Sequence, residues 1–497
     1  MMKKTSLWLK ILLFVIFILG IGIRLYDLKD PPLDFYATRQ LRSALIARAD
    51  YYRLAPGIDP ETRRLASDLA ALEIYEPPIL EQIVGLTYLV IGSEQIWIAR
   101  IYNALFWALG GLAIWALGKH YTHPIAIVLG LAFYFFLPFS VIASRSFQPE
   151  PWMVMWILLT TWALFRWGET LNWKRAILAG ILGGMTMLVK VVAGFFVLPM
   201  LAAATLTSIG FRKAFRQVQI WCILLFMILP VGLNYMLLNP TGRSADFLSF
   251  WTVSLSGLIL KSNFYADWLA MVQGLTGLMV LVVSAIGVAL AEHRVRALLL
   301  ALWIGYGLYG LVFPYQYTTH EYYHLPLVAL VALSILPIAD VALQRLKKEG
   351  WLWKALVAGV LLFASFYSLY VSRSILYAAN YRNEPIAWRR VGEAIPSGHP
   401  FVGLTADYGM RLSYYGWRNM GASWPTGGDL HLYSLTGQGK LDTKSFFNEF
   451  TRGKDFFLVT AFSELDAQPE LKELLYQNYP IYAQGDGFML FDLRKPK

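Results

Sequence analysis

The chain has 497 residues, of which 57% are hydrophobic and only 15% are charged, whereas soluble domains carry about 25% charged residues. This composition excludes an ordinary soluble protein and indicates a polytopic helical membrane protein. The formal net charge of +11 falls largely in short connectors between apolar runs. Such basic connectors are explained by the orientation of the spans in the membrane, and they do not indicate a nucleic-acid partner. The single cysteine, Cys222, excludes a disulfide framework and a thiolate metal cluster.

The first apolar run, Leu7–Ile23, follows the basic N-terminus MMKKTS. It is long enough to cross the hydrocarbon core as a helix. No small-residue cleavage site follows it, so an uncleaved first span is predicted rather than a signal peptide. A polar stretch then leads into a large outer loop, predicted to run from residue 24 to residue 95.

The end of this loop, IYEPPILEQIVGLTYLVIG (Ile74–Gly92), is apolar but short and contains Glu76 and Glu81. If it does not cross the membrane, the chain returns through the next long apolar run, and the basic connectors all fall on the side of the N-terminus. Counting it as a span would invert that pattern. The positive-inside rule therefore predicts a helix that starts at the prolines Pro77 and Pro78 and lies at the outer surface.

About eleven membrane-spanning helices are predicted in all, with the chain in the cytoplasmic (inner) membrane. The two spans on either side of Lys190 are separated by that residue alone, so an error there would reverse the orientation of everything that follows. The predicted spans are 7–23, 96–118, 124–142, 151–167, 176–190, 192–210, 218–238, 268–291, 297–313, 322–343 and 352–374.

The composition becomes more polar after Ser374. The segments HPFVGLTADYG, DFFLVTAF and FMLFDL are typical of short strands, and LDAQPELKELLYQNY is typical of an amphipathic helix. The sequence thus predicts a helical membrane domain over residues 1–375, which includes the outer loop, and a small α/β domain over residues 381–497 on the outer face.

Charged residues near lipid are costly, and here they gather in the predicted outer connectors. Asp34 follows two prolines directly after the first span. A carboxylate at an apolar rim has a raised pKa and could take a proton from a hydroxyl group. Alternatively, Asp34 caps a helix that begins near Phe35.

Glu76 precedes the predicted surface helix. The helix dipole would favour a carboxylate there, or Glu76 could form an acid pair with Asp34 or share a divalent ion with it.

Two further connectors carry charges on the predicted outer side. SRSFQPEPW places Arg145 and Glu150 between two spans, where Arg145 could bind a phosphate or reach lipid headgroups. Lys190 ends the apolar run GGMTMLVK. A charged ammonium in such a place is expected to have a phosphate or a carboxylate as its partner.

The segment PYQYTTHEYYHLPL (Pro314–Leu327) is dense in aromatic residues. An interfacial belt explains its tyrosines, but it does not explain His320, Glu321 and His324. The two histidines would share a face if this segment were helical, and they could contact a metal or a phosphate.

The order of these features resembles the GT-C type membrane glycosyltransferases, particularly the group of protein O-mannosyltransferases and bacterial lipid A aminoarabinose transferases (glycosyltransferase 39 family). The resemblance covers about residues 5–375. Asp34 occupies the place of the family's acid after the first span, and Glu76 in YEPP matches its glutamate before proline, with Pro77 where lysine is usual. SRSFQPE has Glu150 where the family has aspartate. MLVK resembles the family's lysine turn through Lys190, and EYYHLPL its tyrosine and Leu-Pro motif, which includes Tyr323.

The resemblance implies transfer of a sugar from a polyprenyl-phosphate donor to an acceptor on the outer face, by an inverting displacement. Asp34 and Glu76 would be catalytic, with Asp34 as the base. The expected contacts to the donor phosphate are Arg145, Lys190 and His320. The residues expected to position the acceptor or a metal are Glu150, Glu321, Tyr323 and His324, and a divalent metal ion could also be held by Asp34 and Glu76. The acceptor is a lipid, a glycan or a protein.

A transporter or flippase for lipid-linked sugars is the main alternative. Transporters tend to place ionisable groups near the middle of the bilayer and to contain paired repeats. This sequence shows neither pattern, which favours the enzyme.

Overall fold

The computed structural model describes residues 6–71, 76–238, 243–437 and 441–497. The chain divides into two compact units. The first, here called the helical unit, comprises Met1–Leu28, Ile74–Ile79 and Ile98–Ala379. The second, the mixed unit, comprises Lys29–Glu73, Leu80–Trp97 and Asn380–Lys497.

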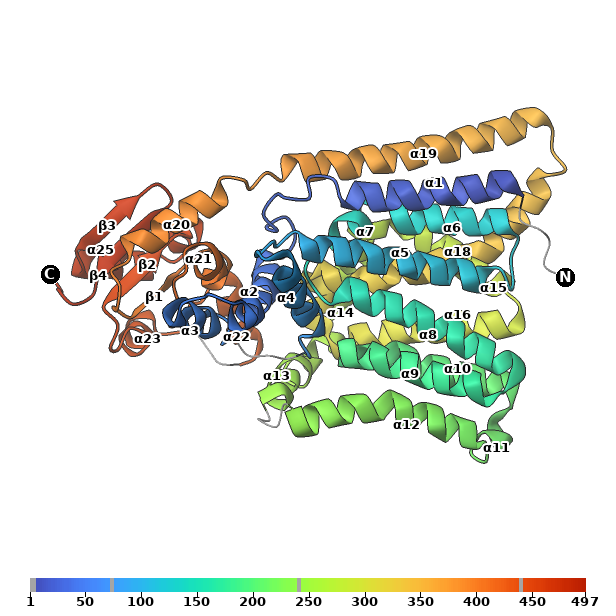
Figure 1. Ribbon diagram of the computed structural model, residues 1–497, viewed down its shortest axis with the longest axis horizontal. Coiled ribbons are helices and arrows are strands. Elements are labelled where there is room, and N and C mark those ends of the chain that lie inside the picture. Colours follow the sequence, from blue (N-terminus) through green and yellow to red (C-terminus); the bar gives the residue numbers. More distant parts are fainter. Residues whose placement is uncertain (1–5, 72–75, 239–242, 438–440) are drawn as a thin grey trace. The chain divides into compact units, whose positions relative to one another are not determined.

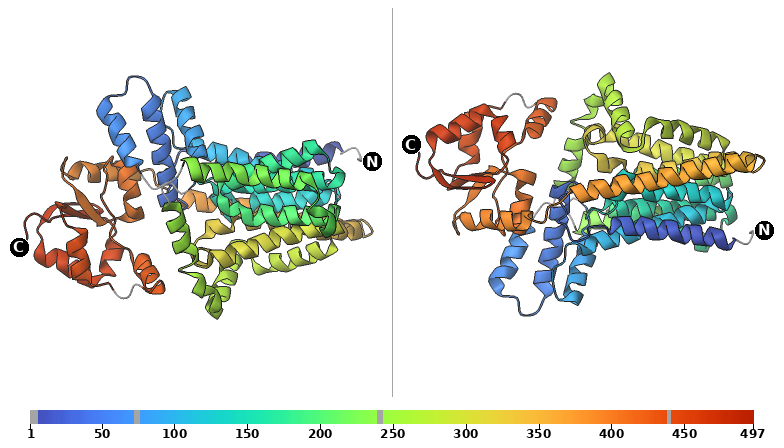
Figure 2. Two further views of the ribbon diagram at one scale, coloured as in Figure 1. Left: turned by 90° about the horizontal axis from the view of Figure 1, so that it is seen from below. Right: turned by 90° about the horizontal axis from the view of Figure 1, so that it is seen from above.

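Long helices run side by side in the helical unit, as Figures 1 and 2 show. They are α1 (Leu7–Arg24), α5 (Ile98–Gly118), α6 (Pro124–Phe136), α8 (Glu150–Thr170), α9 (Trp173–Val189), α10 (Gly194–Ser208), α12 (Val218–Leu233), α16 (His293–Val312), α18 (Leu325–Leu346) and α19 (Trp351–Ala378). Shorter helices join them: α7 (Pro138–Ala143), α11 (Phe211–Ala214), α13 (Arg243–Thr252), α14 (Ser262–Thr276), α15 (Leu278–Leu290) and α17 (Pro314–Thr319). Among the described residues, seven helices are long and apolar enough to cross a membrane, or eight if one bent pair is counted.

Seven of the eleven expected spans coincide with these seven helices. The span expected at 268–291 is wrong as a straight helix, because α14 and α15 meet at an angle of 90°. The bend lies at Gly277, whose φ of +80° belongs to the left-handed region that glycine adopts without strain. Helices also form in the expected spans 124–142, 151–167 and 176–190, but their crossing of the membrane stays a prediction.

Helix α18 is central to the helical unit, since it packs against α6, α8, α15 and α16. Its first half is almost entirely buried, from Leu325 to Pro337. Helix α19 is the opposite case, with only 6% of its most apolar stretch buried. Exposed apolar side chains on such a helix are what a lipid-facing surface requires.

Three helices of the predicted outer loop belong to the mixed unit together with the C-terminal segment. They are α2 (Ala37–Leu54), α3 (Pro60–Leu69) and α4 (Ile79–Ile91). Helix α2 packs directly against α21 (Met410–Tyr415) of that segment. Helix α4 corresponds to the predicted surface helix. Its 13 residues span only about 20 Å, less than the hydrocarbon core of about 30 Å.

The C-terminal segment contains a four-stranded sheet in the order β1-β2-β4-β3. Strand β1 (Phe401–Leu404) pairs parallel to β2 (Phe456–Val459), while β4 (Phe488–Asp492) pairs antiparallel to both β2 and β3 (Ile481–Gly485). The helices around the sheet are α20 (Glu384–Ala394), α21 (Met410–Tyr415), α22 (Gly427–Leu435), α23 (Thr443–Phe450), α24 (Phe462–Asp466) and α25 (Pro469–Asn478). The expected small α/β fold is confirmed, and β3 is an additional strand.

Arg48 joins α2 to the rest of the mixed unit. Its guanidinium pairs with Glu94 at 3.0 Å and donates to the carbonyl of Tyr414 at 2.7 Å. Burial acts to lower the pKa of Arg48, but the neighbouring Glu94 carboxylate outweighs this and leaves the pKa above its ordinary value. The outer loop, which the sequence analysis grouped with the spans, is thus tied to the C-terminal segment.

Candidate functional site

A buried lysine between two glutamates is the main polar feature at one end of the helical unit. Lys190 follows α9 with an extended backbone (φ −157°), and its side chain is only 5% exposed. Its ammonium lies 2.5 Å from a carboxylate oxygen of Glu150 and 3.2 Å from one of Glu76. We call Glu76, Lys190 and Glu150 the ion triad.

Local sequence positions each member of the ion triad. Glu150 is the first residue of α8, just after Pro149, and Glu76 precedes the prolines before α4. Glu150 is 2% exposed and Glu76 is 28% exposed. One positive and two negative charges leave the triad with a formal charge of −1, so the more exposed carboxylate, Glu76, is the one that can be released at low cost.

Aromatic rings cover the lysine of the triad. The rings of Tyr322 and Tyr323 have their centroids 5.8 and 5.3 Å from the Lys190 ammonium, within the range of cation–π attraction. Tyr323 also contacts Tyr309, with ring centroids 5.3 Å apart. This places Tyr323, one of the expected site residues, directly beside Lys190.

His324 is engaged elsewhere. Its Nε2 donates to the carbonyl of Tyr317 at 2.9 Å, and its Nδ1 lies 2.6 Å from the hydroxyl of Tyr306. A carbonyl only accepts, so Nδ1 of the neutral ring accepts from the Tyr306 hydroxyl. Because both ring nitrogens are used and the side chain is fully buried, His324 serves as a core residue, and the expected metal role does not fit it.

His320 and Glu321 lie where the helix α17 ends. His320 has an extended backbone and Glu321 begins a 3-10 turn, Glu321–His324. The helical spacing considered for the two histidines is therefore absent. The ring of His320 packs against Tyr315, Tyr322 and Tyr323, which puts it near the aromatic cover of the triad.

Three buried arginines surround the end of the first helix. Arg145 donates to the carbonyls of Tyr26 and Asp27 at 2.8 and 3.2 Å, and Arg100 donates to the carbonyl of Leu28 at 3.0 Å. Arg24 donates to the carbonyl of Phe135 at 2.9 Å and to the hydroxyl of Ser144 at 2.6 Å. Sequence analysis identified Arg145 but missed Arg24 and Arg100. Arg24 has the visible signal of an arginine at the end of an apolar run, whereas Arg100 stands near the start of one.

Asp34 lies in the mixed unit, just before α2. The interpretation of Asp34 as a helix cap is wrong, because α2 begins at Ala37 and its N-cap position is Tyr36, with a left-handed φ of +49°. The half-buried Asp34 carboxylate instead accepts a hydrogen bond from Gln40 at 3.4 Å. The pKa of nearby Tyr381 is raised, first by burial and further by negative charges that include Asp34.

No metal site is formed by the described residues. Among them, no group of three or more histidine, cysteine, aspartate or glutamate side chains could hold an ion. Tyr75 of the YEPP motif lies outside the described residues. We therefore assign no step to the divalent ion that the sequence analysis considered for Asp34 and Glu76.

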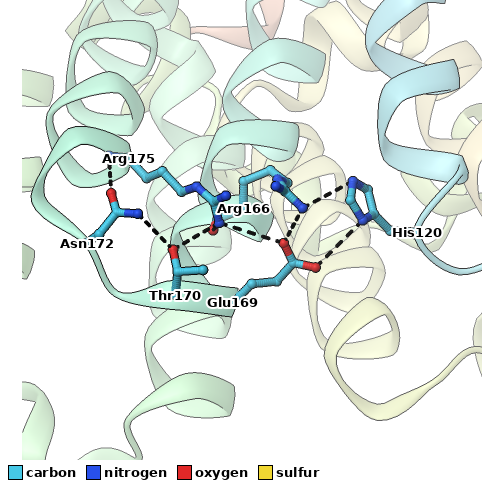
Figure 3. A network of polar contacts seen from close by, with 6 residues as sticks. All are labelled: His120, Arg166, Glu169, Thr170, Asn172 and Arg175. Atoms are coloured by element: carbon cyan, nitrogen blue, oxygen red, sulfur yellow. Dashed lines mark hydrogen bonds and ion pairs between the residues drawn. The ribbon is translucent and has the colours of Figure 1, made fainter. Parts of the chain in front are cut away.

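A second polar network occupies the opposite end of α8 (Figure 3). Glu169 pairs with Arg166 at 2.5 Å and lies 3.6 Å from His120, while Asn172 caps α9 by accepting from the backbone of Arg175. Burial is the main cause of a lowered pKa at His120. Since α8 has 21 residues, this network lies about 30 Å from Glu150 along the helix. The side of the membrane that each connector faces stays a prediction.

Comparison with known proteins supports one fold family. A family model for dolichyl-phosphate-mannose-protein mannosyltransferase matches residues 75–236, whereas no curated protein matches the chain. Among solved structures, ArnT from Cupriavidus metallidurans bound to undecaprenyl phosphate is similar with a TM-score of 0.57 and 15% identity, over 97% of this chain and 97% of that chain.

The oligosaccharyltransferase AglB from Archaeoglobus fulgidus, in complex with an inhibitory peptide and a dolichol-phosphate, has a TM-score of 0.58 and 13% identity, over 98% of this chain and 74% of that chain. Another structure of that enzyme, in complex with Zn and sulfate, has a TM-score of 0.56 and 11% identity, over 97% of this chain and 73% of that chain. The chain therefore has the fold of the GT-C glycosyltransferases, and the resemblance found in the sequence is confirmed.

Proposed function

We propose that this integral membrane protein with a GT-C fold is a glycosyltransferase that moves a hexose or pentose from a polyprenyl-phosphate donor to an acceptor hydroxyl group. The observation that carries the proposal is the ion triad, in which a buried ammonium is held by two carboxylates and covered by tyrosines. The ArnT and AglB structures contain undecaprenyl phosphate and dolichol-phosphate, which supports a lipid-phosphate donor here.

In the proposed reaction, the acceptor oxygen attacks the anomeric carbon of the sugar. The bond from that carbon to the phosphate oxygen breaks, polyprenyl phosphate leaves, and the anomeric configuration is inverted. Asp34 receives the proton of the acceptor hydroxyl. Transfer of this proton in the transition state makes the acceptor oxygen a stronger nucleophile.

Lys190 is the proposed contact to the departing phosphate. In the described state its ammonium is shared between Glu150 and the more exposed Glu76. Exchange of Glu76 for a phosphate oxygen would keep Lys190 paired and release the Glu76 carboxylate beside the reacting groups. Positive charge near the leaving oxygen stabilises the charge that develops in the transition state.

The proposed supporting roles follow from the contacts of the remaining residues. Glu150 would hold Lys190 in place, and Tyr323 and His320 would border the donor. Arg145 would add positive charge to this end of the unit while it fixes the turn at Tyr26 and Asp27. We also propose that the site and the α/β segment face the outside of the inner membrane, as the distribution of basic connectors predicts.

The direct test of the proposed base is the Asp34→Asn variant, which removes proton acceptance at nearly constant shape. Purified protein is mixed with a labelled polyprenyl-phosphate sugar and acceptor-containing membranes, and polyprenyl phosphate release is measured. We expect a fall in kcat of about 10²–10⁴-fold, the range for general base catalysis, with little change in the apparent KM for the donor.

The matched control is Asp68→Asn, which alters an exposed aspartate on α3 and should leave turnover unchanged. Wild-type turnover in the Asp34→Asn variant would refute the role of Asp34 as base. A product with retained anomeric configuration would refute the single displacement.

A further inference from the structure

The mixed unit contains a polar cavity that the proposed chemistry does not use. It has a volume of about 470 Å³ and lies between α3 and two segments of the C-terminal part, residues 395–401 and 417–419. This volume falls in the range of about 300–1,000 Å³ that is typical of small-molecule sites. The lining residues used below are Glu61, Arg64, His399, Trp417, Arg418 and Asn419.

Trp417 gives the cavity a fixed aromatic wall. The guanidinium carbon of Arg48 lies 4.3 Å from its ring centroid, and the ring of Tyr52 meets it edge-on at 5.5 Å. Its backbone is left-handed, with φ at +52°. Such strain in a bulky residue costs about 1–3 kcal/mol and persists where the surroundings impose it, often at ligand sites.

Two arginines give the cavity an excess of positive charge. The guanidinium of Arg418 donates to the carbonyls of Gly392 and Ile395 at 2.8 and 3.1 Å and to the hydroxyl of Ser397 at 3.3 Å. These partners fix the position of the Arg418 guanidinium. Because all of them are neutral, they do not balance its charge.

Arg64 adds a second charge from the other wall. It is exposed, and it makes no hydrogen bond or ion pair with the residues that the structure describes. Glu61 on the same helix contributes one negative charge, and His399 is bound to Asp455 at 2.7 Å. With Arg64, Arg418 and Glu61 counted, the wall carries a formal charge of +1, which favours an anionic ligand.

We propose that this cavity binds an acidic saccharide, meaning a pyranose that carries a carboxylate or a phosphate group. The apolar face of the sugar ring would lie on the indole of Trp417, and its anionic group would be held by Arg64 and Arg418. Asn419 and His399 supply polar groups for sugar hydroxyls. The role of this saccharide as the acceptor rests on the proposed glycosyl transfer, whereas its binding to the cavity does not.

The test uses the full-length protein in detergent, with no donor present. Binding of glucuronate, glucose 6-phosphate, glucose and inorganic phosphate is measured by ligand-observed NMR titration. The three sugars differ only at carbon 6, so they separate the contribution of the anionic group from that of the ring. We expect glucuronate or glucose 6-phosphate to bind about tenfold or more tightly than glucose, as loss of a charge-assisted hydrogen bond of about 1.5–3 kcal/mol requires.

The Arg64→Ala variant should remove most of this preference without affecting the fold, because the Arg64 side chain makes no described contact of its own. Arg452→Ala is the matched control, since Arg452 is also exposed in the mixed unit but does not line the cavity. It should bind all ligands as the wild type does.

Three results would overturn the proposal: equal binding of glucose and the acidic sugars, binding of inorganic phosphate as tight as that of the acidic sugars, or equal effects of Arg64→Ala and Arg452→Ala. The second result would indicate a simple anion site, and the third would indicate a nonspecific effect of charge. Because no donor takes part, failure here would leave the transfer proposal intact, and loss of transfer would leave this binding unaffected.

Discussion

Lys190 shows at the level of single residues how burial and charge decide the properties of the site. Its ammonium is 5% exposed and depends on Glu150, which is 2% exposed. Removal of one partner of such a buried pair typically costs about 3–5 kcal/mol, because the other charge is left without compensation. The more exposed Glu76 can instead be hydrated when its partner is lost.

We therefore expect Lys190→Met to lower the free energy of unfolding by about 3–5 kcal/mol, and Glu76→Gln by less than about 1 kcal/mol. The check is to measure the thermal unfolding midpoints of both variants in the same detergent. The midpoint of Lys190→Met should be the lower of the two. Equal midpoints would contradict the unequal cost expected for the loss of the buried Lys190 and of the more exposed Glu76.

His120 makes a pH-dependent contribution at the other end of the helical unit. Burial lowers its pKa in the folded protein, so the unfolded chain binds the proton more readily. The stability that His120 contributes is thus present above its ordinary pKa of about 6.5 and is lost as the pH falls through the lowered folded pKa.

The test compares the wild type with His120→Gln at pH 7.5 and pH 5.5. The wild type should lose more thermal stability on acidification than the variant does. An identical loss in both proteins would show that His120 does not titrate in this way.

Sequence patterns identified those residues whose chemistry conflicts with their surroundings. Lys190 was found because a lysine cannot end an apolar run without a partner, and a carboxylate was one of the two partners considered. Arg24 and Arg100 were missed, since Arg24 bonds to Phe135 and Ser144, over 100 positions away in the chain. Such pairs follow from the packing of helices and have no local signal.

At the scale of elements, glycines set how closely α9 approaches α12. A Cβ atom on Gly184 would collide with the carbonyl oxygen of Phe226, and one on Gly180 would lie 2.8 Å from the Cβ of Phe226. Small residues four positions apart allow such close contact of membrane helices, which associate mainly through packing. Lys190 directly follows α9, so a shift of this helix would also move Lys190.

The variant Gly184→Ala should therefore lower the thermal unfolding midpoint and also reduce transfer activity, because α9 must shift. The control Gly232→Ala adds the same methyl group on α12, where nothing lies within 4 Å. If Gly184→Ala is as stable and active as that control, the tight α9–α12 contact is not required.

The types of the elements were predicted better than the points at which a helix bends. Apolar runs correctly indicated seven long helices, and short runs such as FMLFDL correctly indicated strands. The bend at Gly277 was missed because a glycine inside an apolar run is equally compatible with a straight helix. Strand β3 was missed because most of its residues are exposed on both faces, so no alternation of apolar and polar residues marks it.

At the scale of the whole molecule, the account depends on the side of the membrane that each connector faces. In a variant without Cys222, Ser93→Cys should react with an impermeant thiol reagent from the outside only, and Ser208→Cys from the cytoplasmic side only. The basic connectors predict this orientation. Labelling of Ser93→Cys from the cytoplasm would contradict it.

The grouping of distant segments could not be predicted from the sequence. Residues 29–73, 80–97 and 380–497 form one compact unit, in which Arg48, Glu94 and Tyr414 come together over a separation of 366 positions. A change of composition near Ser374 marks the start of the α/β segment, but it cannot indicate which earlier helices pack on it.

The measurement that tests the central claim most directly is the fate of the donor in proteoliposomes that contain only the purified wild-type protein. With a labelled polyprenyl-phosphate sugar and an acceptor extract present, the account predicts that polyprenyl phosphate is released as the label moves to the acceptor. Movement of the intact donor across the bilayer without cleavage would identify a transporter and contradict the account.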